Sequence, residues 1–246
     1  MSADLRHGRW QDVLADVTCD AFISDPPYSE RTHAGNTDLA ARVRRTDGFA
    51  INDLVYAPMT PAGVAEMVKH WSPRTRGWMA CFCDTALIPA YEAAYLASGR
   101  MTFAPVPWLQ HRPRLGGDGP GSGACYLMVA RPREKRFLSW GSLPCWYGPT
   151  MAPRTTDPWH HIGGKPLDIM RAIVRDYSRP GDLVCDPYAG GGTTALACLT
   201  EGRRAIGAEV DPDTHAKATA RLSTWQPSLF VPEIKAEAQD LFGGQP

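Results

Sequence analysis

The sequence Asp25-Pro26-Pro27-Tyr28 places a carboxylate and an aromatic ring directly after a short apolar segment, residues 19–24. Proline removes a backbone donor and fixes φ, so a strand formed by this segment must end there. The residue before each proline is also restricted to extended geometry. We therefore expect a rigid turn that presents Asp25 and Tyr28 at the end of a strand, where ligands bind in open α/β sheets.

A second candidate site is the glycine-rich turn "DPYAGGGTT", residues 186–194, which follows the apolar run 183–185. Glycines let the backbone approach a ligand, and the helix that follows presents free N–H groups. The phosphate-loop pattern lacks its lysine, and Thr193 and Thr194 interrupt the dinucleotide pattern. Glu209 ends the next strand, where a carboxylate can accept hydrogen bonds from two ribose hydroxyls. The pattern predicts a nucleoside-bearing ligand without a pyrophosphate.

These two turns must be positioned by the alternating apolar and amphipathic segments around them. The expected strands cover residues 19–24, 77–84, 101–110, 124–132, 183–185 and 205–208. The expected helices cover residues 61–71, 86–99, 165–178, 195–199 and 211–222. Residues 29–58 are polar and are expected to form a long loop. Alternation of this kind predicts an α/β fold, a mostly parallel central sheet with helices on both faces.

The length of 246 residues favours a single domain, residues 1–246. Basic and acidic residues balance at 26 each, but residues 100–136 carry seven basic and two acidic residues, a local net charge of +5. Such asymmetry is compatible with a phosphate-facing side and equally with a solvated loop.

The seven cysteines show no repeating spacing and are expected to be free thiols in a reducing cytosol. Cys81, Cys83, His160 and His161 could imitate a zinc site, but without a paired C-x₂-C spacing we expect no metal. The N-terminus has no apolar signal core and no run reaches membrane-spanning length. These features predict a cytoplasmic protein.

Three motifs together resemble the β-class of S-adenosylmethionine-dependent DNA amino-methyltransferases. "DPYAGGGTT" is similar to their cofactor motif "DPFAGSGTT", and "DPPY" matches their catalytic motif. "HIGGKP", from His161 to Pro166, is similar to the "HPTxKP" entry into the helix before the cofactor strand. The motifs occur in the order of this class, catalytic before cofactor, over most of residues 5–222. The resemblance implies a Rossmann-like methyltransferase fold with a circularly permuted motif order.

The resemblance also implies which residues bind S-adenosylmethionine. Glu209 should bind the ribose, with Val210 beside the adenine, and Lys165 and His161 should line the same pocket. Gly191 replaces the usual serine, and Gly8-Arg9 stands where the family often has "GD", so Asp12 is expected to substitute for the missing carboxylate. The residues expected around the cofactor at the glycine-rich turn are Asp186, Pro187, Tyr188, Ala189, Gly190, Gly192, Thr193 and Thr194.

The catalytic motif suits an exocyclic amine of adenine or cytosine, whose lone pair is delocalised into the ring. Asp25 and the carbonyl of Pro26 would accept hydrogen bonds from the amine and free that pair. Tyr28 offers a stacking face to an extruded base, a contact worth about 1–3 kcal/mol. The base must leave the duplex, so base flipping is implied, and methyl transfer would be a direct displacement governed by positioning.

DNA contacts are expected from basic residues outside these motifs. Residues 110–160 form the expected target-recognition segment, since arginine suits guanine edges and phosphates. The loop 29–58 would close over the base or remain a solvated connector. The short recognition segment suggests a short target in double-stranded DNA or a homodimer. The expected DNA-binding residues are Arg42, Arg44, Arg45, Arg112, Arg114, Arg131 and Arg133.

The tail, residues 223–246, contains the sequence Gln226-Pro227-Ser228-Leu229-Phe230, which resembles the peptide that bacterial partners insert into the replication sliding clamp. The alternative is that this segment packs its Leu and Phe onto the core of its own chain, which we prefer.

The favoured function is adenine-N6 methylation of DNA without an attached nuclease. Cytosine-N4 methylation is the alternative within the family, and "SPPY" is the more usual motif for it. A catalytically silent DNA-binding relative is the alternative from another class. Cys145 after Pro144 resembles the nucleophile of cytosine-C5 methyltransferases, but its order relative to the cofactor motif argues against that role. Protein-glutamine methyltransferases carry a tetrapeptide that begins with Asn and follows the cofactor motif, unlike Asp25.

Overall fold

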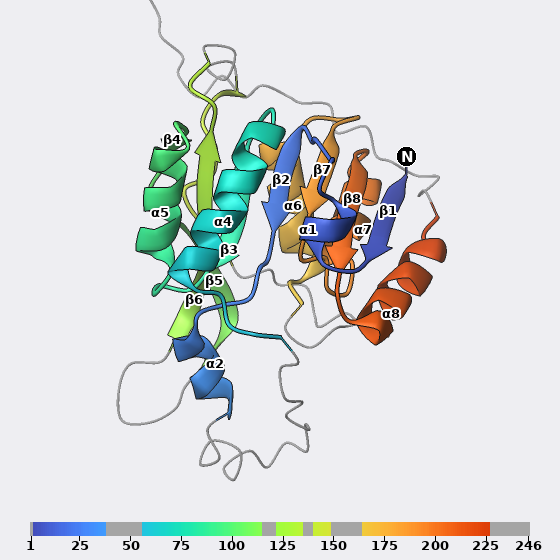
Figure 1. Cartoon of the computed structure of the whole chain (residues 1–246), viewed down its shortest axis with the longest axis horizontal. Helices are drawn as coiled ribbons and strands as arrows, with labels where there is room; N and C mark the ends of the chain where they lie inside the picture. The colour runs from blue at the N-terminus through green and yellow to red at the C-terminus, as the bar shows by residue number, and fades with distance from the viewer. Residues whose placement is uncertain (1, 38–55, 115–121, 135–139, 149–163, 227–246) are drawn as a thin grey trace, which may run out of the picture.

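The computed structural model describes residues 2–37, 56–114, 122–134, 140–148 and 164–226. These residues form one eight-stranded sheet with the order β1-β8-β7-β2-β3-β6-β4, and β5 also pairs with β6 (Figure 1). Strands β1, β8, β7, β2 and β3 are parallel, whereas β6 is antiparallel to β3, β4 and β5. The strands are β1 (Ala3–His7), β2 (Ala21–Ser24), β3 (Met79–Cys83), β4 (Met101–Thr102), β5 (Val106–Arg114), β6 (Ser122–Arg131), β7 (Leu183–Asp186) and β8 (Arg204–Glu209).

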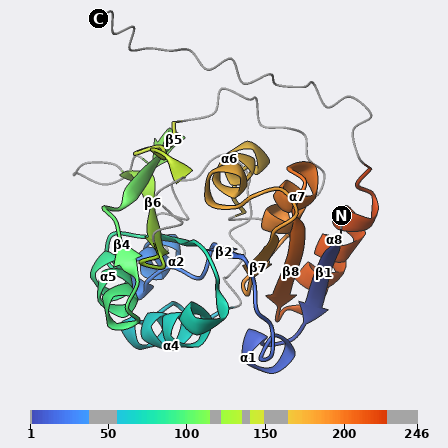
Figure 2. The ribbon, with the colours of Figure 1, turned by 90° about the horizontal axis from the view of Figure 1, so that it is seen from above.

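Helices cover both faces of the sheet, as Figure 2 shows from above. One face carries α1 (Trp10–Val13), α4 (Pro61–Trp71) and α5 (Ile88–Ala97), and the other carries α6 (Leu167–Tyr177) and α7 (Thr193–Thr200). Helix α8 (Pro212–Ser223) packs beside β1 and β8, while α2 (Glu30–Thr37) follows β2 and η1 (Ser72–Arg74) follows α4. The predicted mostly parallel sheet with helices on both faces is therefore confirmed.

Two apolar layers hold the helices against the sheet. Phe22 and Trp71 are fully buried in the layer under α4, and the next residue of β2, Ile23, is fully buried in the opposite layer with Ile173 of α6. Successive side chains of a strand point to opposite faces, so a strand covered on both sides is apolar throughout. The run at residues 21–23 follows this rule.

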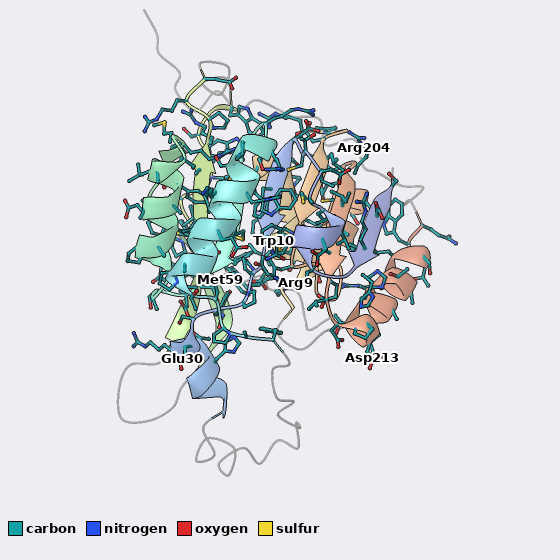
Figure 3. The ribbon with its side chains drawn as sticks, viewed as in Figure 1. Arg9, Trp10, Glu30, Met59, Arg204 and Asp213 are labelled. Atoms are coloured by element: carbon teal, nitrogen blue, oxygen red, sulfur yellow. The ribbon has the colours of Figure 1, made fainter. Side chains whose placement is uncertain are left out.

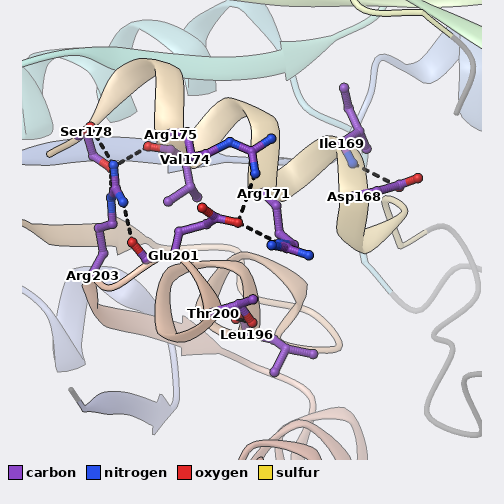
Figure 4. Close-up of polar contacts among 10 residues, drawn as sticks. All are labelled: Asp168, Ile169, Arg171, Val174, Arg175, Ser178, Leu196, Thr200, Glu201 and Arg203. Atoms are coloured by element: carbon purple, nitrogen blue, oxygen red, sulfur yellow. Dashed lines mark hydrogen bonds and ion pairs between the residues drawn. The ribbon is translucent and has the colours of Figure 1, made fainter. Parts of the chain in front are cut away.

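Helix α6 is tied to α7 and to the residues that follow it by charged side chains (Figure 4). Glu201, after the end of α7, accepts hydrogen bonds from Arg171 Nε at 2.6 Å and Arg175 Nη1 at 3.1 Å. Arg203 donates to the hydroxyl and the carbonyl of Ser178, at 3.1 and 3.0 Å. These contacts fix the position of α6, and with it the residues that precede its first turn.

Some sequence predictions about elements were wrong. Residues 29–58 were expected to be a loop, but Glu30–Thr37 form α2. Residues 101–110 were expected to be one strand, but β4 ends at Thr102 and β5 begins at Val106, and Pro105 in the break has no backbone donor for a ladder. The strand expected at residues 124–132, by contrast, corresponds to β6. Strand β1 and helix α1 had no predicted counterpart.

None of the helices in the described ranges has the length and apolar character that a bilayer-spanning segment needs.

Candidate active site

The turns at Asp25 and Asp186 follow neighbouring strands, although they lie far apart in the chain. Strand β2 pairs in parallel with β7, and Ser24 Oγ donates a hydrogen bond to Asp186 Oδ1 at 2.6 Å. From this pair the chain continues to β3 on one side and to β8 on the other, which makes it a topological switch point of the sheet. Such a point, at the carboxyl ends of the strands, is the usual ligand site of an open α/β sheet.

Figure 3 shows the same edge with its side chains, where Arg9, Trp10 and Met59 are labelled; Arg204, at the beginning of β8, marks the opposite edge. Met59 N donates to the carbonyl of Tyr28 at 2.9 Å, so the end of the catalytic-motif turn is fixed by the segment before α4.

Asp186 is buried beneath the glycine-rich turn, with 5% of its surface exposed. Its Oδ1 accepts hydrogen bonds from Ser24 Oγ and, at 3.1 Å, from Tyr188 N. Burial raises the pKa of Asp186 to about 6, although hydrogen bonds from Ser24, Thr194 and Tyr188 act to lower it. The carboxylate therefore faces inward and fixes the shape of the turn.

Both carboxylate oxygens of Glu209 accept hydrogen bonds from backbone N–H groups at the carboxyl end of the sheet. Gly190 N donates to Oε2 at 2.9 Å and Asp211 N donates to Oε1 at 2.8 Å. Gly190 has φ +50°, and among the described residues a Cβ at this position would meet only Tyr188 O, at 4.0 Å. The turn therefore holds the Glu209 carboxylate while leaving open space over Gly190.

Gly207 lets the glycine-rich turn approach β8 closely. A Cβ at Gly207 would lie 2.8 Å from Asp186 O, nearer than real Cβ atoms approach, and 3.1 Å from Ala189 Cβ, a tight contact. Ala189 N also donates to Ala208 O at 2.9 Å. A glycine is needed at position 207 for β7 and β8 to carry their turns so near to each other.

Side chains from other elements complete this half of the site. Tyr188 OH accepts a hydrogen bond from Trp10 Nε1 at 3.1 Å. Arg221 Nη1 donates to Thr193 Oγ1 at 3.0 Å and to Gly191 O at 2.8 Å. The predicted turn residues Asp186, Pro187, Tyr188, Ala189, Gly190, Gly192, Thr193 and Thr194 thus lie together between β7 and α7.

Val210 and Asp12 lie at the same end of the sheet as Glu209. Val210 directly follows Glu209 and is 56% exposed. Asp12 is exposed on α1, which begins soon after Gly8, whose N donates to Glu209 O at 2.9 Å. An apolar side chain and a carboxylate are therefore exposed at this end of the sheet.

The catalytic-motif turn contains an ion pair. Lys165 Nζ contacts Asp25 Oδ2 at 2.5 Å, and the exposed fractions of the two side chains are 8% and 23%. The other carboxylate oxygen, Asp25 Oδ1, is buried and has no hydrogen-bond partner in the described structure. Burial, followed by the charge of Asp25, raises the pKa of Tyr28 well above its usual value. Tyr28 therefore stays neutral and can act only through its ring and its un-ionised hydroxyl.

Asp84, which the sequence analysis did not single out, lies in the same region. It follows β3, and its Oδ2 accepts hydrogen bonds from Ser29 N at 3.1 Å and from the hydroxyls of Ser29 and Thr32, both at 2.5 Å. Its Oδ1 is buried and unpartnered in the described structure, like that of Asp25. Its position after a buried strand of the parallel sheet was the signal that could have identified it.

The predicted DNA-binding arginines are placed very differently from one another. Arg131 is only 9% exposed, and its guanidinium lies over the rings of Trp78 and Phe103, at 5.9 and 5.6 Å. This packing buries most of the Arg131 side chain. Arg133 is exposed and donates to the carbonyl of Gly99 at 3.3 Å. Arg112 and Arg114 belong to β5.

Several predictions fall outside the described residues. These are His160 and His161, the arginines Arg42, Arg44 and Arg45, and the clamp-like peptide from Pro227 onward. Within the described ranges, no group of three His, Cys, Asp or Glu residues is arranged to hold a metal ion. All seven cysteines are free thiols, and Cys145 is the exposed one.

Comparison with known proteins agrees with this geometry. Residues 135–220 match the family model described as DNA methylase. The type II methyltransferase M.XycI of Xanthomonas campestris pv. cyanopsidis is 30% identical over 114 residues, 43% of this chain and 38% of that protein. The type II methyltransferase M.HindIII of Haemophilus influenzae is 28% identical over 146 residues, 57% of this chain and 46% of that protein. The chain thus spans less than half of the length of either relative.

Solved structures match over most of the chain. The M1.HpyAVI–SAM complex has a TM-score of 0.64 at 20% identity, covering 89% of this chain and 98% of that one. The cytosine-N4-specific PvuII DNA methyltransferase has a TM-score of 0.63 at 12% identity, covering 94% and 89%. These matches confirm the predicted Rossmann-like methyltransferase fold.

Proposed function

We propose that this chain, whose residues 135–220 match the DNA methylase family model, transfers a methyl group from S-adenosylmethionine to the N6 amine of adenine in double-stranded DNA. One observation carries the proposal. Asp25, with a carboxylate oxygen that is buried and unpartnered in the described structure, directly follows β2, and β2 pairs with β7, the strand that leads into the glycine-rich turn at Gly190. An acceptor for an amine and a turn that a ligand can approach therefore share the carboxyl end of the sheet.

The residues on the cofactor side fit S-adenosylmethionine. The open space over Gly190 admits a ligand against the backbone, and the Glu209 oxygens retain lone pairs for ribose hydroxyls beyond the two backbone donors that hold them. The exposed Val210 offers an apolar surface to an adenine ring. When bound, S-adenosylmethionine supplies the activated methyl group.

The residues on the target side bind and orient the base. Asp25 Oδ1 accepts a hydrogen bond from the exocyclic amine, and the Pro26 carbonyl accepts a second, which draws the nitrogen towards tetrahedral geometry and frees its lone pair. The neutral ring of Tyr28 stacks on the base, which must be extruded from the duplex to reach these groups. Because the nucleophile is the base itself, the protein forms no covalent bond to it and acts by positioning.

Adenine is preferred to cytosine because the motif begins with Asp25, as in the adenine-type "DPPY". Cytosine N4 is the second candidate, since PvuII DNA methyltransferase, which is cytosine-N4-specific, has the same fold. Both amines present the same pair of hydrogens to Asp25, so the product must be identified chemically.

The test incubates the full chain with methyl-labelled S-adenosylmethionine and unmethylated genomic DNA, followed by digestion to nucleosides. We expect label in N6-methyl-2′-deoxyadenosine. Label in N4-methyl-2′-deoxycytidine would show that cytosine, not adenine, is the target, and an absence of label with intact cofactor binding would support the catalytically silent relative instead. DNA methylated beforehand in vivo by the same protein is the matched negative control, because its sites are already filled.

A further inference from the structure

Lys165 places its ammonium group on the target side of the site. Nζ lies 2.5 Å from Asp25 Oδ2, and only 8% of the lysine side chain is exposed. The same nitrogen lies over two aromatic rings, 5.0 Å from the centroid of Tyr28 and 4.8 Å from that of Phe82. A carboxylate oxygen and two ring faces therefore surround the charge.

The position of Lys165 is fixed by the backbone as well as by these contacts. It directly precedes Pro166, the N-cap of α6, and α6 is held against α7 by Arg171 and Arg175 through Glu201 (Figure 4). Cation–π contacts grow stronger where the charge is desolvated, which favours the buried arrangement of this ammonium. Lys165 is therefore a pre-positioned cation rather than a mobile surface lysine.

The two oxygens of Asp25 consequently differ. Oδ2 is occupied by Lys165, whereas Oδ1 is buried and has no partner in the described structure. Leaving a carboxylate oxygen buried without a donor is unfavourable, so its orientation must be maintained by the contacts of the other oxygen. An acceptor held in this way needs no reorganisation when a donor arrives.

We propose that Lys165 is a positioning residue that holds Asp25 through Oδ2 and so reserves Oδ1 for the amine of the flipped base. The inference rests on the proposed function. It assigns Lys165 to the target side of the site, whereas the sequence motif alone associated this lysine with the cofactor pocket. The charge of Lys165 also offsets that of Asp25 beside the ring of Tyr28.

The kinetic test compares Lys165→Met and Lys165→Arg with the unchanged protein. Met keeps much of the length and apolar contact with Tyr28 and Phe82 but loses the charge. For Lys165→Met we expect kcat to fall about 100-fold, since a misplaced catalytic group costs on this order. The Kd for S-adenosylmethionine and the KM for DNA should change less than threefold, and Lys165→Arg should recover at least tenfold in kcat. Lys69→Met, an exposed lysine of α4 far from the site, is the matched control.

A second measurement does not depend on activity. Thermal unfolding of Lys165→Met, Asp25→Asn and the double variant forms a cycle, in which the Tm should fall by about 3–6 °C for Lys165→Met alone and largely recover in the double variant. Additive Tm changes would overturn the pairing, and a Kd for S-adenosylmethionine weakened tenfold or more by Lys165→Met would return Lys165 to the cofactor side. If the unchanged protein transfers no methyl group, the proposed function fails, while the cycle and the Kd still decide the position of Lys165.

Discussion

The two turns at the centre of the site differ in how far their carboxylates are satisfied. On the cofactor side, Asp186 accepts from Ser24 and Tyr188, and both Glu209 oxygens accept from backbone N–H groups. On the target side, Asp25 and Asp84 each keep one buried oxygen without a partner in the described structure. The first turn is complete within the chain, whereas the second has acceptors left over.

This difference has a physical meaning. Buried polar atoms are nearly always hydrogen-bonded, so two unpartnered carboxylate oxygens in one region of the site require an explanation. A donor supplied by a ligand would provide one, and an exocyclic amine offers such hydrogens. The cofactor side needs only to keep its shape, which its internal hydrogen bonds accomplish. On the target side, the carboxylate oxygens without a hydrogen-bond partner lower the stability of the folded protein.

The largest effect is expected for a substitution of Asp25, which should impair methyl transfer without impairing cofactor binding. Asp25→Ala removes the unpartnered acceptor, so methyl transfer should fall by about 10³-fold, the loss seen when a pre-organised hydrogen-bonding group is removed. Binding of S-adenosylmethionine should remain within threefold, because Asp186 and Glu209 keep all their partners. Transfer is measured with labelled cofactor and binding by titration calorimetry. A fully active Asp25→Ala variant would show that the target-side acceptor is irrelevant.

The converse change disturbs only the cofactor side. Gly207→Ala forces a Cβ to within 2.8 Å of Asp186 O, so the turn must move away from β8. Overpacking of this kind costs about 1–3 kcal/mol in the free energy of unfolding. The Kd for S-adenosylmethionine should rise about tenfold, an order-of-magnitude expectation from displacement of a binding turn.

Gly99→Ala is the matched control for the glycine substitution. Gly99 has φ +76°, but a Cβ there meets no atom within 4 Å, so only backbone strain is added. It should lower stability by about 1 kcal/mol and leave cofactor affinity unchanged. If both alanine variants bind the cofactor as the unchanged protein does, close approach at Gly207 is not needed for binding.

Much of the fold and of the site could be predicted from the sequence. The expected helix 61–71 matches α4, and the two motif turns meet because each follows a strand of one parallel sheet, whose carboxyl ends share an edge. Strand β1 could not be anticipated, since Ala3–His7 has little apolar content and gains its structure by pairing with β8, about 200 residues away. Pairing with so distant a segment leaves no local pattern.

Side-chain partnerships were the other part that the sequence did not reveal. The motif around Lys165 identified an entry into a helix, but spacing along the chain does not tell which carboxylate a long side chain reaches. Arg131 looked like a surface cation because it lies in a basic segment, yet it packs over Trp78 and Phe103. A long, partly apolar arginine side chain can be buried where its charge has a ring to contact.

A smaller effect is expected at Asp84, the second unpartnered carboxylate. Asp84→Ala removes three hydrogen bonds that hold Ser29 and Thr32, at the end of the Tyr28 turn and the start of α2. The kcat/KM for DNA should fall about tenfold, because net hydrogen bonds to charged groups contribute about 1.5–3 kcal/mol and part of this orders the turn. Asp84→Asn keeps one acceptor oxygen and should retain most of the activity; equal losses in both variants would indicate that the negative charge itself is needed.

The last prediction concerns the pH dependence of stability and lies on the cofactor side. Burial raises the pKa of Asp186 from its ordinary value near 3.8 to about 6, so between these values the folded protein keeps a proton that the unfolded chain has released. The stability contributed by this protonation is fully present below about pH 3.8 and is lost as the pH rises through about 6. Asp186→Asn cannot titrate but keeps an acceptor oxygen for Ser24 and Tyr188. The free energy of unfolding of the variant, measured in urea, should therefore gain on the unchanged protein between pH 4 and pH 7, by roughly 3 kcal/mol for a two-unit shift. A constant difference across this range would mean that Asp186 has the same pKa in the folded and the unfolded protein. Burial of its carboxylate would then have no electrostatic cost.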